Sequence, residues 1–280
     1  MRRVRATFFL LAVLVAATLA AASPARAAPT LAVFGDSFSL TLRDGVRDWP
    51  ALLQQQGLVG RIANFAVSGG SATPRPHRSF AEEVDRWEHA GRPRGVTVVY
   101  LGYVDIGFIG GDLAKARAGY RDGIARLVRG GAASGANRLL LVEPHDVGSM
   151  PLFNRTAKRG ALRRATEDWR GFVAGTARAD GATPVDVFAA IDRVLRDPRA
   201  HGFTNVTTAD RARSGTTALY REPFHVGQRG QAIIADTIAA RLRHGAAAPA
   251  EPEVAAVEGA AVPWPADDPA LLAAAFGPGD

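Results

Sequence analysis

Short runs of hydrophobic residues alternate along the chain with longer stretches whose hydrophobic positions repeat every three to four residues. The short runs predict β-strands, and the longer stretches predict amphipathic helices. The predicted strands are 31–34, 61–65, 96–101, 138–143 and 184–188, and the predicted helices are 48–56, 79–90, 112–129, 156–178, 188–196 and 227–243. Strands separated by helices of this length need crossover connections, which indicate a mostly parallel sheet covered on both faces. The pattern therefore predicts an α/β fold built as a three-layer α/β/α sandwich.

The N-terminal segment 1–27 has the pattern of a secretory signal peptide. Arg2, Arg3 and Arg5 precede a hydrophobic run over 8–22, which ends in Ser-Pro-Ala-Arg-Ala, a small-x-small cleavage signal. An uncleaved membrane anchor is the alternative, but the run is short for crossing about 30 Å of hydrocarbon. We expect cleavage before Ala28, no membrane span after cleavage, and a secreted or periplasmic protein.

The C-terminal segment differs in composition from the rest of the chain. From 246 to 280 it is rich in Ala, Pro, Glu and Asp and has no sustained periodicity. Such composition is typical of a flexible tail. We therefore expect one domain over 28–245 and a monomeric protein.

Charge and cysteine content narrow the function classes. The formal net charge is +7, but four arginines and no acidic residue precede Ala28, so the predicted mature chain carries only +3. The remaining arginines are dispersed along the sequence, which gives no support for a nucleic-acid partner. With no cysteine present, disulfides, thiol nucleophiles and thiolate metal sites are excluded.

Ser37 is the first candidate for chemistry, because Gly35-Asp36-Ser37 directly follows the predicted strand 31–34. In parallel α/β sheets, functional residues collect at the carboxyl ends of strands, and Ser37 has that position. A glycine and an aspartate also favour an ordinary turn, so the stretch by itself is explained equally well without catalysis.

A serine nucleophile needs a base, and the base needs a third group that orients it. Among the six histidines, His225 has Glu222 three residues before it, a spacing that places both side chains on one side of a helical turn. His145 is the rival and has Asp146 beside it, but adjacent side chains generally point apart. We interpret His145 as a loop residue near the mouth of the site. No pair of histidines has the spacing of a zinc site.

The stretch "NFAVSGG" ends in a glycine-rich turn after the predicted strand 61–65. Backbone N–H groups in such turns stabilise the oxyanion that forms during acyl transfer, which makes Gly69 a candidate donor. Glycine pairs are equally common in ordinary loops between a strand and a helix.

Several of these stretches together resemble the GDSL or SGNH hydrolases, which are esterases and lipases with a flavodoxin-like parallel sheet. The resembling stretches are "VFGDSFS", "NFAVSGG", "VVYLGYVDIG", "LLLVEPHDVGSMP", "DPRAHGFTNVT" and "YREPFHVGQRGQAIIADTIA", in order from about Leu31 to Arg243. The resemblance is strongest to the branch with secreted phospholipases (lecithinases), haemolysins and plant GDSL lipases. It implies Ser37 as nucleophile, His225 as base, and oxyanion donation by the N–H groups of Ser37 and Gly69, without metal or cofactor.

The chain departs from the family pattern at important positions. The family's Gly-x-Asn-Asp segment reads Gly102-Tyr103-Val104-Asp105, so valine replaces the asparagine whose side chain donates to the oxyanion. Whether Tyr103 or Asp105 reshapes the oxyanion hole stays open. Glutamate replaces the usual aspartate at Glu222, a change that other hydrolase triads tolerate.

The resemblance implies a secreted serine esterase or lipase acting on a small-molecule or lipid ester. Asp36, Tyr103, Val104, Asp105 and His145 are expected as neighbours of its site. The segments 150–156 and 201–220 are the expected walls of the acyl pocket. The alternatives are an inactive relative that binds lipid or glycan in the same cleft, which Val104 favours, and an acyltransferase.

Overall fold

Five parallel strands form the centre of the computed structural model, which describes residues 28–41, 46–109 and 113–244. They are β1 (Thr30–Gly35), β2 (Ile62–Asn64), β3 (Gly95–Tyr100), β4 (Arg138–Glu143) and β5 (Thr183–Asp186), in the order β2-β1-β3-β4-β5. All five hydrophobic runs therefore form strands, as predicted. The expected signal peptide 1–27 and the whole of the expected tail 246–280 lie outside the described residues.

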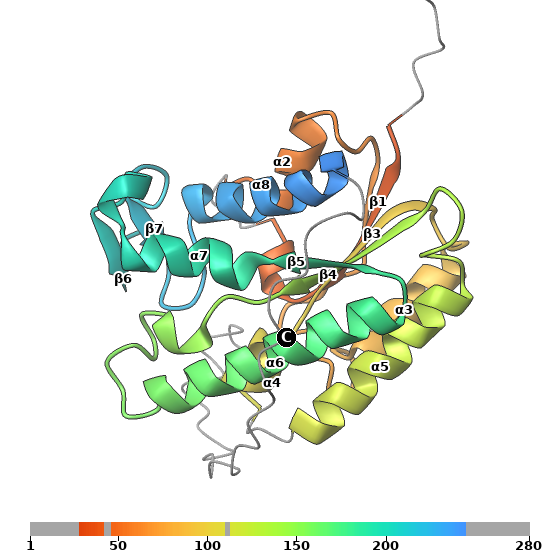
Figure 1. Cartoon of the computed structure of the whole chain (residues 1–280), viewed down its shortest axis with the longest axis horizontal. Coiled ribbons are helices and arrows are strands. Elements are labelled where there is room, and N and C mark those ends of the chain that lie inside the picture. Colours follow the sequence, from red (N-terminus) through yellow and green to blue (C-terminus); the bar gives the residue numbers. More distant parts are fainter. Residues whose placement is uncertain (1–27, 42–45, 110–112, 245–280) are drawn as a thin grey trace, which may run out of the picture.

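Helices cover both faces of the sheet, which confirms the predicted three-layer α/β architecture (Figure 1). One layer contains α2 (Trp49–Gln55), α7 (Val187–Arg196) and α8 (Gln228–His244), and the other contains α3 (Phe80–His89), α5 (Leu113–Arg129) and α6 (Arg159–Ala179). Among the described residues, no helix is both long and apolar enough to cross a membrane.

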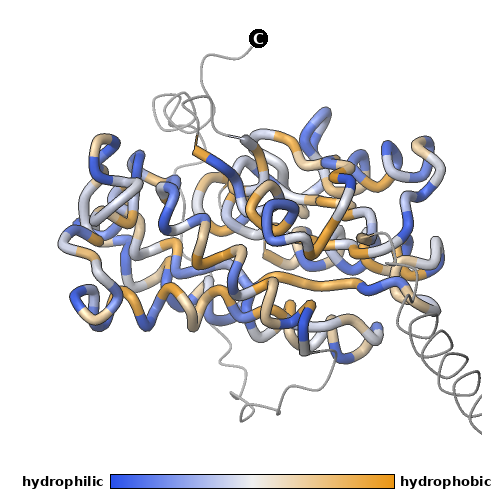
Figure 2. Tube along the Cα trace, turned by 90° about the horizontal axis from the view of Figure 1, so that it is seen from above, coloured by the Kyte–Doolittle hydropathy of each residue, from blue (hydrophilic) through white to orange (hydrophobic). Residues whose placement is uncertain are grey.

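The hydrophobic core follows the strands. Every residue of β1, β3 and β4 except the first is buried, as expected for parallel strands covered on both faces. In Figure 2 the hydrophobic positions gather along the inner segments, while many outer turns are hydrophilic. The buried face of α3 contributes Phe80, Val84 and Trp87, which are spaced at i, i+4 and i+7.

The strands that follow β1 in the sequence are added on opposite sides of it. From β1 the chain passes to β2 on one side and then crosses to β3 on the other, so the carboxyl end of β1 lies at a topological switch point. Loops that follow neighbouring strands diverge at such a point, which makes it the usual ligand site of open α/β sheets.

Two features are not apparent in the hydrophobic pattern. A small second sheet pairs β6 (Asn205–Ala209) with β7 (Ala218–Tyr220), and α4 (Tyr103–Gly107) is a five-residue helix directly after β3. The sheet was missed because β6 buries only Val206. Helix α4 begins after Gly102, whose φ of 127° and close contact with the Trp169 indole leave no room for a side chain.

Candidate active site

Ser37, His225 and Glu222 form a continuous hydrogen-bonded chain in the structure. The Nε2 atom of His225 lies 2.8 Å from Ser37 Oγ, and its Nδ1 atom lies 3.0 Å from Glu222 Oε2. Ser37 and His225 are 188 positions apart in the sequence. A hydroxyl, an imidazole and a carboxylate in this order and at these distances have the geometry of a catalytic triad.

Ser37 follows the carboxyl end of β1, an inner strand of the sheet. Gly35 has a φ of 153°, and a Cβ on it would collide with the carbonyl oxygen of Tyr100 on the neighbouring strand. Asp36 then caps the short 3₁₀ turn η1 (Ser37–Ser39), accepting the Phe38 N–H at 2.9 Å. The glycine and the aspartate of the motif therefore form a turn, and that turn leaves Ser37 partly exposed between two buried residues.

A tight turn before α8 presents the base. The N–H groups of Arg221 and Glu222 both donate to the His225 carbonyl, at 2.9 and 3.3 Å, which brings the carboxylate and the imidazole together. Gly227 packs so closely against Ser214 that no side chain would fit. Its presence is thus explained by local packing.

Glu222 has the charge that an orienting group needs. Its hydrogen bond to His225 and the nearby arginines lower its pKa below the usual value, although partial burial acts in the opposite direction. Arg211 contacts the second carboxylate oxygen at 3.1 Å. The carboxylate is therefore ionised at neutral pH, and it favours the imidazole tautomer that carries its proton on Nδ1 and leaves Nε2 free to accept from Ser37.

Solved structures with a similar fold include two acetylxylan esterases. Axe2, an acetylxylan esterase from Geobacillus stearothermophilus, matches at 18% identity and a TM-score of 0.52, over 76% of this chain and 94% of that one. The acetyl xylan esterase AlAXEase matches at 17% identity and a TM-score of 0.53, over 75% and 98% of the two chains. This chain has the fold of these esterases.

Two further matching structures are catalytic mutants of Axe2, one with a serine and one with an aspartate replaced by alanine. LAE5, an alpha/beta hydrolase from the metagenome of Lake Arreo in Spain, matches at 17% identity and a TM-score of 0.50, over 78% of this chain and 96% of that one. No family model matches the sequence, and no curated protein matches it.

The turn that carries Gly69 lies beside the serine. The Val67 N–H donates to the Gly35 carbonyl at 3.0 Å, and a Cβ on Gly70 would collide with that same carbonyl. Gly69 has a φ of 70°, and within the described part of the chain neither its N–H nor that of Ser37 has a hydrogen-bond acceptor. Both donors are thus available for an oxyanion.

Val104, where the family has asparagine, is buried in α4 with 3% of its surface exposed. Neither neighbour replaces the missing donor. Asp105 accepts the N–H groups of Ala72 and Thr73, each at 2.9 Å, and therefore anchors that loop. The Tyr103 hydroxyl contacts Tyr100 and the imidazole of His145 inside the core.

His145 is fully buried, so it does not line an open mouth as the sequence had suggested. Its Nδ1 contacts the Tyr103 hydroxyl, and its Nε2 has no hydrogen-bond partner among the described residues. Burial lowers its pKa to about 3, so the imidazole stays neutral. Asp146 binds Arg163 and the Gly148 N–H instead of His145, as the argument from adjacent side chains predicts.

Two residues next to the triad were not recognised from the sequence. Phe38 stacks on Tyr103 at a ring distance of 4.0 Å and meets the His225 ring edge-on at 5.3 Å. Glu83 is buried, and its Oε2 accepts the Gly35 N–H at 2.8 Å. A signal for Glu83 exists, because it follows Phe80 by three positions and so falls on the hydrophobic face of α3.

Burial shifts the pKa of both carboxyls next to the turn that carries Ser37 in the same direction. Burial raises the pKa of Asp36 to about 8, the hydrogen bond from Phe38 opposes that rise, and Asp105 adds to it. Burial also raises the pKa of Glu83 well above its usual value. In the described residues, no group of three or more histidines and carboxylates is arranged to hold a metal ion.

Proposed function

We propose that this protein hydrolyses carboxylic esters through an acyl-enzyme on Ser37, as a GDSL or SGNH type of serine hydrolase. The observation that carries the proposal is the pair of hydrogen bonds that connects Ser37 Oγ to His225 Nε2 and His225 Nδ1 to Glu222. Because an isolated serine hydroxyl is a weak nucleophile, an imidazole in contact with it and held by an ionised carboxylate has a direct chemical role.

In the proposed reaction, Ser37 Oγ attacks the ester carbonyl carbon while its proton moves to His225 Nε2. The carbonyl oxygen becomes an oxyanion that accepts from the Ser37 and Gly69 N–H groups. His225 then protonates the leaving alcohol, and the C–O bond breaks to leave the acyl group on Ser37. Water repeats these steps, with His225 as base, and releases the acid. Glu222 stays ionised throughout and stabilises the imidazolium.

We further propose short acyl groups, acetyl first, as the substrate class and the outside of the cytoplasm as the location. The shared fold with acetylxylan esterases supports the first part, and the signal-peptide pattern of 1–27 supports the second. Assignment to the lipase and haemolysin branch stays a prediction. Hydrolysis of p-nitrophenyl acetate and p-nitrophenyl palmitate by the purified protein compares acetyl with lipid acyl groups.

The decisive experiment combines turnover with covalent labelling. Purified protein is incubated with p-nitrophenyl acetate and, separately, with a fluorophosphonate probe, and the labelled peptide is identified by mass spectrometry. Ser37→Ala should lose both turnover and labelling. Ser39→Ala is the matched control, because its buried hydroxyl contacts the Trp49 indole and lies outside the triad. Absence of both turnover and labelling in the folded parent protein would overturn the proposal.

A second candidate is a binding protein with little or no turnover, and Val104 favours it. Loss of one oxyanion donor typically lowers the rate by about 10²- to 10³-fold. Labelling of Ser37 together with turnover no faster than that of Ser37→Ala would favour this candidate. An acyltransferase would instead transfer the acyl group to an added alcohol such as glycerol, which product analysis detects.

A further inference from the structure

A cavity of about 420 Å³ lies near the N-terminal end of α6, and arginines dominate its lining. Arg155, Arg159, Arg163 and Arg196 line it together with Asp146 and Asp192. None of the three triad residues belongs to the lining. The lining comes from the 3₁₀ turn η2 (Val147–Ser149) and the residues on either side of it, from α6 and α7, and from β6.

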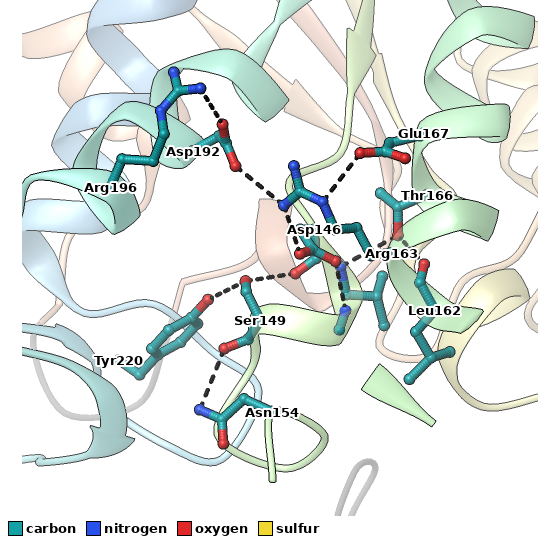
Figure 3. A network of polar contacts seen from close by, with 12 residues as sticks. Asp146, Ser149, Asn154, Leu162, Arg163, Thr166, Glu167, Asp192, Arg196 and Tyr220 are labelled. Carbon is teal, nitrogen blue, oxygen red and sulfur yellow. Dashed lines mark hydrogen bonds and ion pairs between the residues drawn. The ribbon is translucent and has the colours of Figure 1, made fainter. Parts of the chain in front are cut away.

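Both carboxylates of the cavity are already bound to arginines. Arg163 lies between Asp146 and Asp192, 3.1 Å from each, and also contacts Glu167 (Figure 3). Arg196 contacts the other oxygen of Asp192 at 3.2 Å. The guanidinium of Arg163 is therefore neutralised and has a structural role in joining α6 to α7 and η2.

Arg155 and Arg159 differ from Arg163 and Arg196, which are bound to carboxylates. Both are exposed, and neither has an ion pair within the described ranges of the chain. Arg159 is also the first residue of α6, a 21-residue helix without a side-chain N-cap or an acidic residue in its first turn. A positive charge there is unfavourable, because the N–H groups and the helix dipole already make a helix N-terminus positive. The cavity consequently has uncompensated positive charge.

The loop that carries these arginines is held by specific contacts. Asn154 donates its side-chain N–H to the Thr207 carbonyl at 2.6 Å, and the Arg159 N–H donates to Thr156 at 3.2 Å. The carbonyl of Arg159 packs directly against Gly148, where no side chain would fit. The backbone positions of both arginines are thus determined by the surrounding fold.

Part of the lining is hydrophobic. Leu195 and Val206 contribute apolar surface beside the arginines. The volume falls within the usual range of pockets for small molecules, roughly 300–1,000 Å³. Guanidinium groups bind carboxylates and phosphates with two parallel hydrogen bonds, so two unpaired arginines favour an oxyanion head group.

We propose that this cavity binds a small organic anion, with its carboxylate or phosphate group held by Arg155 and Arg159 and its apolar part against Leu195 and Val206. The proposal does not depend on ester hydrolysis, since the site shares no residue with the triad.

The test measures binding of two probes, phenylphosphonate and benzoate, by isothermal titration calorimetry at constant ionic strength. The parent protein should bind at least one of them, and R155A/R159A should bind it at least tenfold more weakly. R155K/R159K keeps the charge but lacks the planar fork, so its affinity should fall by a smaller factor of at least threefold. It also keeps the test decisive if the alanine variant does not fold.

Two control proteins locate the site. R61A/R129A removes two exposed arginines that lie outside the cavity, and its affinity should stay within twofold of the parent value. Ser37→Ala should bind the probe normally, since that residue belongs to the other site. No binding of either probe, equal binding by R155A/R159A, or equal losses in R61A/R129A or Ser37→Ala would each overturn the proposal.

Discussion

Two buried histidines contact the same phenylalanine ring but differ in their environment. Phe38 lies 5.3 Å from the His225 ring and 5.6 Å from the His145 ring. His225 has a carboxylate on one nitrogen and a serine hydroxyl on the other. His145 has a tyrosine hydroxyl on one nitrogen and no partner on the other among the described residues. A histidine can therefore act as the base only if both of its ring nitrogens have suitable partners. Lying close to Ser37 is not enough.

The largest expected effect separates these two histidines. His225→Ala should lower kcat for p-nitrophenyl acetate by about 10⁴- to 10⁶-fold, because the triad acts as a unit. His145→Phe should change kcat by less than about tenfold, since the backbone N–H of residue 145 still donates to the Tyr103 hydroxyl. Steady-state kinetics with folded variants measures both. Equal losses in the two variants would contradict the distinction.

The next effect concerns the partner of His225. Glu222→Gln should lower kcat by about 10²- to 10⁴-fold, because a neutral amide neither stabilises the imidazolium nor enforces the tautomer. Glu222→Asp keeps the charge on a shorter side chain and should retain more activity than the glutamine variant. An unchanged kcat in Glu222→Gln would show that the carboxylate is not the orienting group.

A smaller effect is expected at Val104, which directly follows Tyr103, the hydrogen-bond partner of His145. Val104→Asn restores the family's oxyanion donor and should raise kcat by at least about tenfold, less than the 10²- to 10³-fold that such a donor usually contributes. Val104→Ala is the control, because it opens similar space without a donor. If both variants behave like the parent protein, the oxyanion hole does not extend to this position.

The last effect is on stability instead of rate, and it again distinguishes two buried groups. Asp36 titrates near pH 8 when folded and near its ordinary value of 3.8 when unfolded, so its contribution to stability is present below pH 4 and is lost toward pH 8. Asp36→Asn should therefore gain stability relative to the parent as pH rises from 4 to 8. The gain is up to about 1.4 kcal/mol per pH unit. Urea unfolding at several pH values measures it.

The contribution of His145 to stability changes with pH in the opposite direction. Its pKa falls from 6.5 when unfolded to about 3 when folded, so its contribution is present above pH 6.5 and is lost as pH falls toward 3. The parent protein should lose stability in acid relative to His145→Phe over this window. The same urea experiments decide it, and parallel curves for parent and variant would mean that His145 is not held neutral by burial.

The sequence predicted the strands well because β1, β3 and β4 are covered on both faces and so consist of nearly continuous hydrophobic runs. It also predicted that Ser37 and His225 meet, because several motifs occur in the order of one family. The burial of His145 was not predictable, since its environment is set by Tyr103 and Phe38 from distant segments. The segments 150–156 and 201–220, expected as walls of the acyl pocket, contribute Arg155 and Val206 to the arginine-lined cavity, but nothing in the sequence spacing predicted the arginines that α6 and α7 add to it.

The hydrogen bond between Ser37 and His225 joins residues near the two ends of the described domain. It closes a loop of nearly the whole fold, and contacts of such long range form late because the chain entropy of closure has to be overcome first. The last helix reinforces the closure, since Gln231 of α8 accepts the Trp49 N–H at 3.0 Å. A chain that is still being synthesised lacks this segment, so the nucleophile stays without its base until the entire domain has emerged and folded.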